Sequence, residues 1–317
     1  MESGSLADVI DVRPEIADAV VSGRPVVALE SSLITHGFPY PTNFEVVTRM
    51  WNEIVAGGAT PAAIAVVDGV LSVGLGLDEV DALAARNDTI KVTRANLSFA
   101  IGMKMNGGTT VTTTMMAAHA TGIGVFCTGG LGGVHRGAFD AGDRRPATLD
   151  VSADLEELAR TPVVIVSGGV KSILDVRLTL EYLETKGVPV VTLGSDEFPG
   201  FWSSSSGIPS PLVADTIDDV VALVGAHRQM GLPAGIVVGV PVPSEFELPL
   251  AEAEGVIAQA VAEADDVRGA DVTPWLLTRI AELTDGRSEA ANKEELANNA
   301  RHSAQVAVAL AAAGGVR

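Results

Sequence analysis

The chain has 317 residues, of which 47% are apolar, and its formal net charge is −19. So high an apolar content predicts a large folded core and excludes a disordered chain. The negative charge argues against binding to nucleic acid or to an anionic membrane surface, because both need a basic face. A single cysteine, Cys127, excludes an internal disulfide, and the acidic N-terminus lacks the apolar core of a signal peptide. No apolar stretch is long enough to span a bilayer, so we expect a cytoplasmic protein with small-molecule ligands.

Short β-branched segments alternate with longer amphipathic segments along most of the chain. The predicted strands are residues 26–30, 63–67, 90–92, 124–128, 163–166, 188–193 and 235–240. The predicted helices are residues 43–56, 78–85, 153–159, 172–185 and 217–229. This alternation predicts an α/β fold with a largely parallel central sheet. Beyond residue 250 there are three helical stretches and no strand, so we expect a helical C-terminal cap on a single domain of residues 1–317.

Four polar residues fall at or beside the ends of predicted strands. Glu30 and Thr128 each end a strand, Lys91 lies at the end of a third, and Lys171 follows a fourth. In open α/β sheets, ligands bind beyond the carboxyl ends of the strands. We therefore expect these four side chains to meet at one rim of the sheet and to form a site.

The stretch VALESSLITHGFPYP, residues 27–41, runs from a predicted strand into a loop rich in Gly and Pro. Glu30 could simply be solvated at the strand end, as a lone glutamate often is. Alternatively, it is a general acid or base that is partly desolvated by Phe38 and Tyr40. We interpret His36 as a loop histidine whose ring is bonded to backbone carbonyls.

The segment CTGGLGGVHRGA, residues 127–138, has five glycines between positions 129 and 137. It matches neither the Walker pattern nor the dinucleotide fingerprint, so it gives little support to nucleotide binding. Glycines after a strand let backbone N–H groups approach an anion or a sugar, although they also make a tight connection to a helix. His135 and Arg136 add polar groups whose roles this pattern leaves open.

The segment LDVSADLEEL, residues 149–158, contains Asp150 and Asp154, with Ser152 as the expected N-cap of a helix. Acidic residues in a first helical turn commonly stabilise the helix dipole, which is a sufficient explanation for Asp154. Asp150 precedes the cap and can point into the rim. One carboxylate suffices for Mn²⁺ or Mg²⁺ when water and substrate complete the coordination shell. No cluster of His and Cys indicates zinc.

Lys91, in TIKVTRANLSFA (residues 89–100), lies inside a β pattern. It is either a lysine of an edge strand or, in so acidic a chain, an inward-facing anchor for phosphate. The segment NGGTTVTTTMM, residues 106–116, offers N–H groups and hydroxyls that suit the same role, although runs of hydroxyl residues also cap helices.

Lys171, in VVIVSGGVKSILD (residues 163–175), follows Gly-Gly at the end of a buried strand, so its stem has little open surface to follow. Desolvation favours a free amine, which can attack a carbonyl carbon and form a Schiff base. The carbonyl of a sugar appears when its ring opens. These residues together favour a lysine-imine enzyme that acts on a phosphorylated sugar.

Taken together, the motifs resemble the pseudouridine-5′-phosphate glycosidase family, also called pseudouridylate synthases and related to indigoidine synthase A. The resemblance covers nearly the whole chain, in ordered blocks: VVALESSLITHG, GATPAAIAVVDG, KVTRANL, NGGTTVTTTM, TGGLGGVHRG, DVSADLEEL, GGVKSILD, LEYLETKGVPVV, TPWLLTRIAELTDG and NNA. It implies an α/β/α fold and a homotrimer. It also implies reversible, Mn²⁺-dependent hydrolysis of the C–C glycosidic bond of pseudouridine 5′-phosphate to uracil and ribose 5-phosphate.

The resemblance implies roles for individual residues. Lys171 would be the nucleophile that forms an imine with C1′ of the opened ribose, and Glu30 would be the proton donor and acceptor. Asp150 would bind one Mn²⁺ per subunit, with Mg²⁺ or another divalent ion as a substitute. A C–C bond has no leaving heteroatom to protonate, so the imine would serve as the electron sink while the glutamate protonates the departing carbon. The expected substrate-binding residues are Lys91, Val111, Thr128, His135, Ser152, Ala153, Asp154 and Asn298.

Two features depart from the pattern of this family. The segment FDAGDRRPATL, residues 139–149, is longer than expected, and Ser32 stands where threonine is expected. Two other functions stay open on the residues alone. An aldolase-like lyase for sugar phosphates would keep Lys171 but have no use for uracil. A protein that only binds a phosphorylated metabolite would keep Lys91 and the glycine loop, with Lys171 charged.

Overall fold

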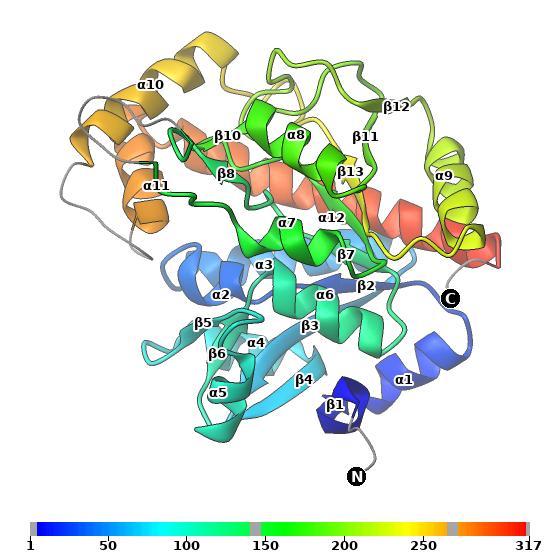
Figure 1. The fold of residues 1–317 in the computed structure, drawn as a ribbon. Helices are drawn as coiled ribbons and strands as arrows, with labels where there is room; N and C mark the ends of the chain where they lie inside the picture. Colours follow the sequence, from blue (N-terminus) through cyan, green and yellow to red (C-terminus); the bar gives the residue numbers. More distant parts are fainter. Residues whose placement is uncertain (1–4, 140–146, 265–271, 315–317) are drawn as a thin grey trace.

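The computed structural model describes residues 5–139, 147–264 and 272–314 and confirms a layered α/β fold around a mostly parallel sheet (Figure 1). Within these residues, eleven strands form the main sheet. They are β1 (Ile10–Val12), β2 (Val26–Leu29), β3 (Thr60–Val67), β4 (Val70–Leu75), β5 (Ile90–Val92), β6 (Gly107–Thr109), β7 (Val125–Cys127), β9 (Val164–Ser167), β11 (Val190–Leu193), β12 (Leu212–Ala214) and β13 (Ile236–Gly239).

The strands follow the order β1-β4-β3-β2-β7-β9-β13-β11-β12, and β6 joins at the side by pairing with β3 and β5. Along this order only β3 and β4 run antiparallel, and β6 is also antiparallel to β3. Strand β2 shows that the sheet is buried on both faces. Val26 and Ala28 belong to one hydrophobic core, and Val27 and Leu29 to the other, as the alternation of side chains along a strand requires.

Helices cover both faces of the sheet. Buried residues of α1 (Pro14–Val21), α6 (Val111–Ala120), α7 (Ala153–Leu158) and α8 (Val176–Thr185) share the core of Val26 and Ala28. Those of α3 (Thr42–Ala56), α9 (Ile217–Gln229) and α12 (Arg287–Ala312) share the core of Val27 and Leu29. This arrangement gives the α/β/α layers that the resemblance implies. After a short 3₁₀ helix (Leu6–Val9), the described helices are α1 (Pro14–Val21), α2 (Ser32–His36), α3 (Thr42–Ala56), α4 (Leu77–Ala84), α5 (Leu97–Gly102), α6 (Val111–Ala120), α7 (Ala153–Leu158), α8 (Val176–Thr185), α9 (Ile217–Gln229), α10 (Leu250–Glu263), α11 (Val272–Leu283) and α12 (Arg287–Ala312).

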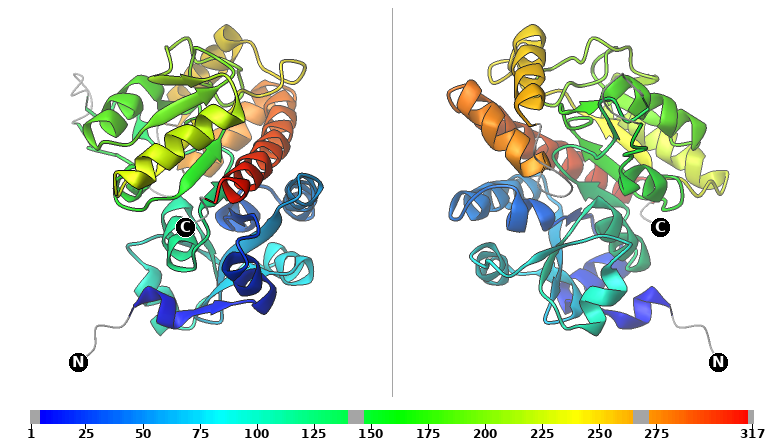
Figure 2. Two further views of the ribbon diagram at one scale, coloured as in Figure 1. Left: turned by 90° about the vertical axis from the view of Figure 1, so that its right-hand side faces the viewer. Right: turned by 60° about the vertical axis from the view of Figure 1, so that its left-hand side comes forward.

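The region after residue 250 is helical, as expected. Helices α10 and α11 lie together on one side of the molecule (Figure 2). The long helix α12 packs directly on the sheet instead, with Leu296, Ala300 and Ala304 buried in the core that it shares with β2 (Figure 1). None of the helices in the described part of the chain is both long and apolar enough to cross a membrane.

The predicted helix of residues 172–185 is wrong at its start. Leu174 and Asp175 form a short strand, β10, that pairs antiparallel with β8 (Val134–His135). The helix α8 begins only at Val176, where the Asp175 side chain caps it by accepting a hydrogen bond from Leu178 N at 2.9 Å. Lys171 therefore stands in the connection between β9 and β10, where its carbonyl oxygen accepts from Leu174 N at 2.9 Å in a turn.

Candidate active site

Glu30 follows β2 and is buried, with 8% of its surface exposed. The hydroxyl of Thr128, which follows the neighbouring strand β7, donates to Glu30 Oε1, and the hydroxyl of Ser32 donates to Oε2. The interpretation of Glu30 as a solvated residue is therefore wrong, because two hydroxyls hold its carboxyl group in one orientation. Of the two aromatic residues expected to desolvate Glu30, Phe38 lines the same cavity as Glu30, whereas Tyr40 is 54% exposed and does not line it.

Lys171 is positioned by glycines on two segments. Gly169 has a φ of +98°, and a Cβ there would lie 2.6 Å from the carbonyl oxygen of Pro199, so this turn needs glycine. Lys171 N donates to the carbonyl oxygen of Leu131 in the glycine loop at 3.0 Å. A Cβ on Gly130 would lie 3.0 Å from Lys171 Cγ, which shows that the glycine loop passes close beside the lysine stem.

Two cavities, of about 220 and about 100 Å³, meet at these side chains. Glu30, Ser32, Lys91 and Lys171 line both of them. Lys91 lies in the middle of β5 rather than at a strand end, yet it reaches the same place. One ligand can therefore extend from the larger cavity into the smaller one and pass both the amine of Lys171 and the carboxyl group of Glu30.

The larger cavity has the features of an anion site. Helix α6 begins at Val111 and points its N-terminus into the cavity, and Thr110 and Thr112 contribute hydroxyls beside it. Lys91 adds a positive charge. Free N–H groups at a helix N-terminus together with a lysine are a common arrangement for binding phosphate. Six residues predicted to contact substrate line this cavity: Lys91, Val111, His135, Ser152, Ala153 and Asp154.

Asp154 joins the glycine loop to α7. Ser152 is the N-cap of α7, as expected, and its hydroxyl accepts from Asp154 N at 3.2 Å. Asp154 lies in the first turn of α7, as expected for a dipole-stabilising residue, but that explanation is incomplete, because Asp154 is buried and its Oδ2 also accepts from Gly132 N at 2.9 Å. Burial raises the pKa of Asp154, and the positive charge of Lys171 opposes that rise. A negative carboxylate at Asp154 would therefore lie close to the lysine amine.

Asp150 lies beside the larger cavity. His135 lines the cavity, and its Nδ1 lies 3.8 Å from Asp150 Oδ2, whose side chain is 59% exposed. Within the described ranges, no three His, Cys, Asp or Glu side chains gather into a metal-binding group. An accessible single carboxylate still fits a divalent ion that takes most of its ligands from water and substrate. Residues 140–146, in the segment that departs from the family pattern, lie outside the described residues.

The smaller cavity has a mixed lining, in which Phe38, Phe201, Leu277 and Leu296 form apolar walls beside the side chains that it shares with the larger cavity. Asn292 of α12 adds an amide group. Apolar walls together with polar side chains suit a flat ring with hydrogen-bonding substituents. Thr128, predicted to contact substrate, also lines this cavity.

Asn298 is the one predicted substrate-binding residue that the structure does not bring into either cavity. Its amide nitrogen donates to the carbonyl oxygen of Pro241 at 3.0 Å. Asn292 and Leu296 are one turn apart on α12 and face the cavity, whereas residue 298 falls on another side of the same helix. The spacing of four residues between Asn292 and Leu296 places both on one face of a helix, and this is the sequence signal that could have identified Asn292.

His36 was interpreted as a loop histidine bonded to backbone carbonyls, but it is the last residue of α2 and lines the smaller cavity. Its Nδ1 lies 2.6 Å from the hydroxyl oxygen of Thr35. Burial and, after it, the positive charge of Lys91 lower the pKa of His36. The ring is therefore neutral near pH 7 and adds a hydrogen-bonding group without a charge.

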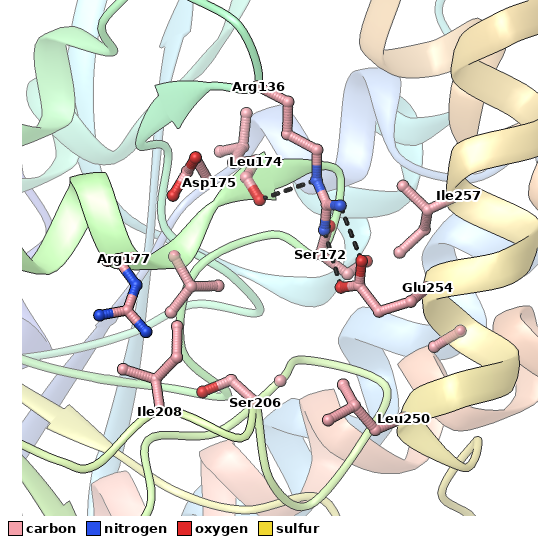
Figure 3. Close-up of a pocket in the computed structure, with 13 residues that line it drawn as sticks. Arg136, Ser172, Leu174, Asp175, Arg177, Ser206, Ile208, Leu250, Glu254 and Ile257 are labelled. Atoms are coloured by element: carbon pink, nitrogen blue, oxygen red, sulfur yellow. Dashed lines mark hydrogen bonds and ion pairs between the residues drawn. The ribbon is translucent and has the colours of Figure 1, made fainter.

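Arg136 lines neither of these cavities. Figure 3 shows its guanidinium group between Glu254 of α10 and the segment that follows Lys171. It donates to both carboxylate oxygens of Glu254 at 2.8 and 2.9 Å, and to the carbonyl oxygens of Ser172 and Leu174 at 2.8 and 3.2 Å. These bonds close one wall of a separate cavity of about 320 Å³ and fasten the segment behind Lys171 to α10.

Comparison with known proteins agrees with this architecture. The chain matches the family model described as "Indigoidine synthase A like protein" over residues 15–309. It is 49% identical to the pseudouridine-5′-phosphate glycosidase of Roseobacter denitrificans over 94% of both chains, and 46% identical to that of Solibacter usitatus over 95% of this chain and 99% of the relative.

Two solved structures extend the comparison, and in each the alignment covers 98% of this chain and 99% of the other. One is the prealnumycin C-glycosynthase in complex with ribulose 5-phosphate, with a TM-score of 0.88 and 34% identity. The other is an indigoidine synthase A-like protein from Thermotoga maritima, with a TM-score of 0.86 and 32% identity. The chain therefore belongs to the indigoidine synthase A-like family.

Proposed function

We propose that this protein is an enzyme that reversibly hydrolyses the C–C glycosidic bond of pseudouridine 5′-phosphate to uracil and ribose 5-phosphate. The observation that carries the proposal is that a cavity with the features of an anion site and a cavity with apolar walls share Lys171 and Glu30 in their linings. A sugar phosphate in the larger cavity and a pyrimidine in the smaller one would have C1′ between them. Relatives that are nearly half identical over almost their full length carry the name of this activity.

In the direction of synthesis, the reaction begins at Lys171. Its amine attacks the aldehyde carbon C1′ of ring-opened ribose 5-phosphate, one proton is taken up, and water leaves to give a protonated imine. C5 of uracil then bonds to C1′, and the imine nitrogen takes the electron pair and becomes an amine. The C4′ hydroxyl finally displaces that amine from C1′, its proton passes to the nitrogen, and the ring closes. Hydrolysis follows the same steps in reverse.

Glu30 moves the proton at C5 of the base. During synthesis its carboxylate accepts the C5 proton as the C–C bond forms, and during hydrolysis its carboxyl group returns that proton to the departing carbon. The hydroxyls of Ser32 and Thr128 hold both oxygens, so the group is oriented before the substrate binds. Ser32, where threonine was expected, keeps the hydroxyl that this role needs.

The remaining residues hold the two halves of the substrate. Lys91 and the N-terminus of α6 would bind the 5′-phosphate, and Ser152 and Asp154 would contact the ribose. Asn292 would hydrogen-bond to the polar edge of uracil, with Phe38 and Phe201 near the ring faces. These contacts leave C1′ and C5 close to Lys171 and Glu30.

Asp150, beside His135, would hold Mn²⁺, or Mg²⁺, together with water and substrate oxygens. Such an ion supplies positive charge that offsets the phosphate in a strongly acidic protein. The cytoplasmic location, the homotrimer and the single domain stay predictions that rest on the sequence and on the family resemblance.

The proposal is tested by incubating the protein with ribose 5-phosphate, uracil and Mn²⁺ and following the products by liquid chromatography and mass spectrometry. We expect uracil to be consumed and a C-nucleotide to appear. An aldolase-like lyase would consume ribose 5-phosphate without uracil, and a binding protein would consume neither, so either result would contradict the proposal. Activity that is unchanged in excess chelator would contradict the metal at Asp150.

A second experiment tests the imine directly. Borohydride added with ribose 5-phosphate should reduce the imine to a secondary amine and attach the sugar phosphate to the peptide that contains Lys171. Lys171→Ala should lose both labelling and turnover, and Lys171→Arg should also be inactive because a guanidinium group stays protonated. Lys104→Ala, which removes an exposed lysine outside the cavities, is the matched control and should keep both. Labelling on Lys104 or Lys91 would contradict the mechanism.

A further inference from the structure

Glu295 of α12 is a buried carboxyl group that the proposed reaction does not use. It has no exposed surface. Its Oε1 accepts from Gly168 N at 3.0 Å and from the side-chain amide of Asn299 at 2.6 Å, and both of these partners are uncharged. Its Oε2 has no hydrogen-bond partner in the described structure. Burial raises the pKa of Glu295 to about 8.

The two partners of Glu295 lie at the ends of the central strands. The amide nitrogen of Asn299 also donates to the carbonyl oxygens of Thr128 and Gly129, at 3.0 and 3.3 Å, and these residues follow β7. Gly168 follows β9, and its N–H also donates to Gly129 O at 2.9 Å. The paired residues of β7 and β9 run from Val125 with Val164 to Cys127 with Val166, and backbone hydrogen bonds such as Leu131 N to Gly169 O at 2.9 Å continue beyond them. Glu295 and Asn299 add side-chain hydrogen bonds to this backbone connection, just where the regular pairing ends.

These two strand ends carry both proposed reacting groups. The hydroxyl of Thr128 holds Glu30, and Lys171 comes three residues after Gly168. We infer that Glu295 is a positioning residue for the reaction. By accepting hydrogen bonds from Gly168 N and the amide of Asn299, it holds the ends of β7 and β9 at the spacing that brings the Thr128–Glu30 pair and Lys171 to one cavity. This inference rests on the proposed function.

The fit around the carboxyl group supports a role in positioning rather than in stability. A Cβ on Gly168 would lie 2.1 Å from Glu295 Oε1, and a Cβ on Gly129 would lie 3.6 Å from Oε2, so the two glycine segments close tightly on this side chain. Burying a carboxyl group without a cation costs free energy, whereas an apolar side chain of similar size would not. An apolar residue would leave the Gly168 N–H and the Asn299 amide each with one hydrogen bond fewer.

Two substitutions separate the hydrogen bonds from the bulk of the side chain. Glu295→Gln keeps the shape and the accepting oxygen, and it should keep kcat within about threefold of the wild type. Glu295→Leu keeps the approximate size and removes the acceptor, so kcat for pseudouridine 5′-phosphate should fall at least about tenfold. The KM should stay within about threefold, because Lys91 and the N-terminus of α6 belong to other elements. The melting temperature of Glu295→Leu should equal or exceed that of the wild type.

Val306→Ala is the matched control on the same helix. Val306 is fully buried and lies in the core shared with β2, so its truncation should lower the melting temperature and leave kcat unchanged. If Glu295→Leu does not fold, Asn299→Ala serves as the second variant. It removes the hydrogen bonds to the carbonyl oxygens of Thr128 and Gly129, so it should lower kcat as much and leave KM unchanged.

Several outcomes would overturn the inference. The first is a kcat of Glu295→Leu equal to that of the wild type, or of Asn299→Ala if Glu295→Leu does not fold. The second is a fall in kcat in Glu295→Gln as large as the fall in Glu295→Leu. The third is a loss of activity that is explained by a lower melting temperature, because it would indicate a role in stability and not in positioning. A wild-type protein without glycosidase activity would instead contradict the proposed function, so the two failures are distinguishable.

Discussion

Replacing Arg94 with methionine should weaken both the fold and the phosphate cavity. The guanidinium group of Arg94 donates to both carboxylate oxygens of Glu157. Arg94 comes three residues after Lys91, and Glu157 lies on α7, whose N-cap Ser152 lines the larger cavity. This ion pair therefore joins two walls of the proposed anion site.

The size of the effect follows from the burial of the two partners. Removing one partner of a buried pair typically costs about 3–5 kcal/mol, because the other charge stays buried without compensation. The Glu157 side chain is 1% exposed, but that of Arg94 is 41% exposed, so solvent screens part of the interaction. Glu157 also keeps a hydrogen bond from the Thr161 hydroxyl. We therefore expect a loss of about 2–3 kcal/mol, or roughly 3–5 °C in the melting temperature of a chain of this length.

Scanning calorimetry and steady-state kinetics test this prediction together. The KM for pseudouridine 5′-phosphate should rise about three- to tenfold, with a smaller change in kcat. Glu157→Gln removes the charge that Arg94→Met leaves unpaired, so the double variant should lose less stability than the sum of the single variants. Arg301→Met removes an exposed ion pair with Glu53 and should shift the melting temperature by less than about 1 °C. A melting temperature of Arg94→Met within that same small range, or strict additivity, would refute the reasoning.

Three further predictions follow from single side chains. Lys91→Ala should raise the KM for pseudouridine 5′-phosphate at least about tenfold and abolish the preference over unphosphorylated pseudouridine, and steady-state kinetics that retain this preference would count against the phosphate role. Asn292→Leu should raise the KM for uracil more than the KM for ribose 5-phosphate, because Asn292 lines the smaller cavity and not the larger. Equal changes in the two KM values would contradict this assignment of Asn292. Glu295 should make the protein less stable as the pH rises, because its folded pKa of about 8 lies above the ordinary value of 4.5, so between these values the folded state keeps a proton that the unfolded state has released. Urea unfolding measures this effect as the difference in free energy of unfolding between the wild type and Glu295→Gln. As the pH rises from roughly 5 to 8, the wild type should lose up to about 1.4 kcal/mol per pH unit relative to the variant. Parallel pH dependences of the two proteins would contradict this prediction.

Much of the fold follows from local patterns in the sequence. Short β-branched runs predict β2, β7, β9, β11 and β13, because strands buried on both faces need continuous apolar residues. Ser152 was predicted as a helix N-cap from its residue type and position alone. Glu30, Thr128 and Lys171 were expected to meet because parallel strands present their carboxyl ends at one edge of a sheet. Family motifs added the expectation of α/β/α layers.

Other features were decided only by tertiary packing. Residues 172–175 read as the start of a helix, yet residues 172–173 form a turn and residues 174–175 a strand, because β10 pairs with β8, which is distant in the sequence. Both Asn292 and Asn298 lie on α12, and only the packing of that helix against the sheet determines that Asn292 faces the smaller cavity.

The partners of Glu157 and Glu295 likewise come from other elements, so no local pattern could reveal them. Arg94 reaches Glu157 from the loop after β5, and the Gly168 N–H reaches Glu295 from the end of β9. Periodicity and capping depend on neighbours a few residues apart, so local patterns predicted most of the central strands, several helices and the polar residues that follow the strands. The burial of a charge and the identity of its partner depend on segments that are distant in the sequence and meet only in the folded chain, so they could not be predicted from local patterns.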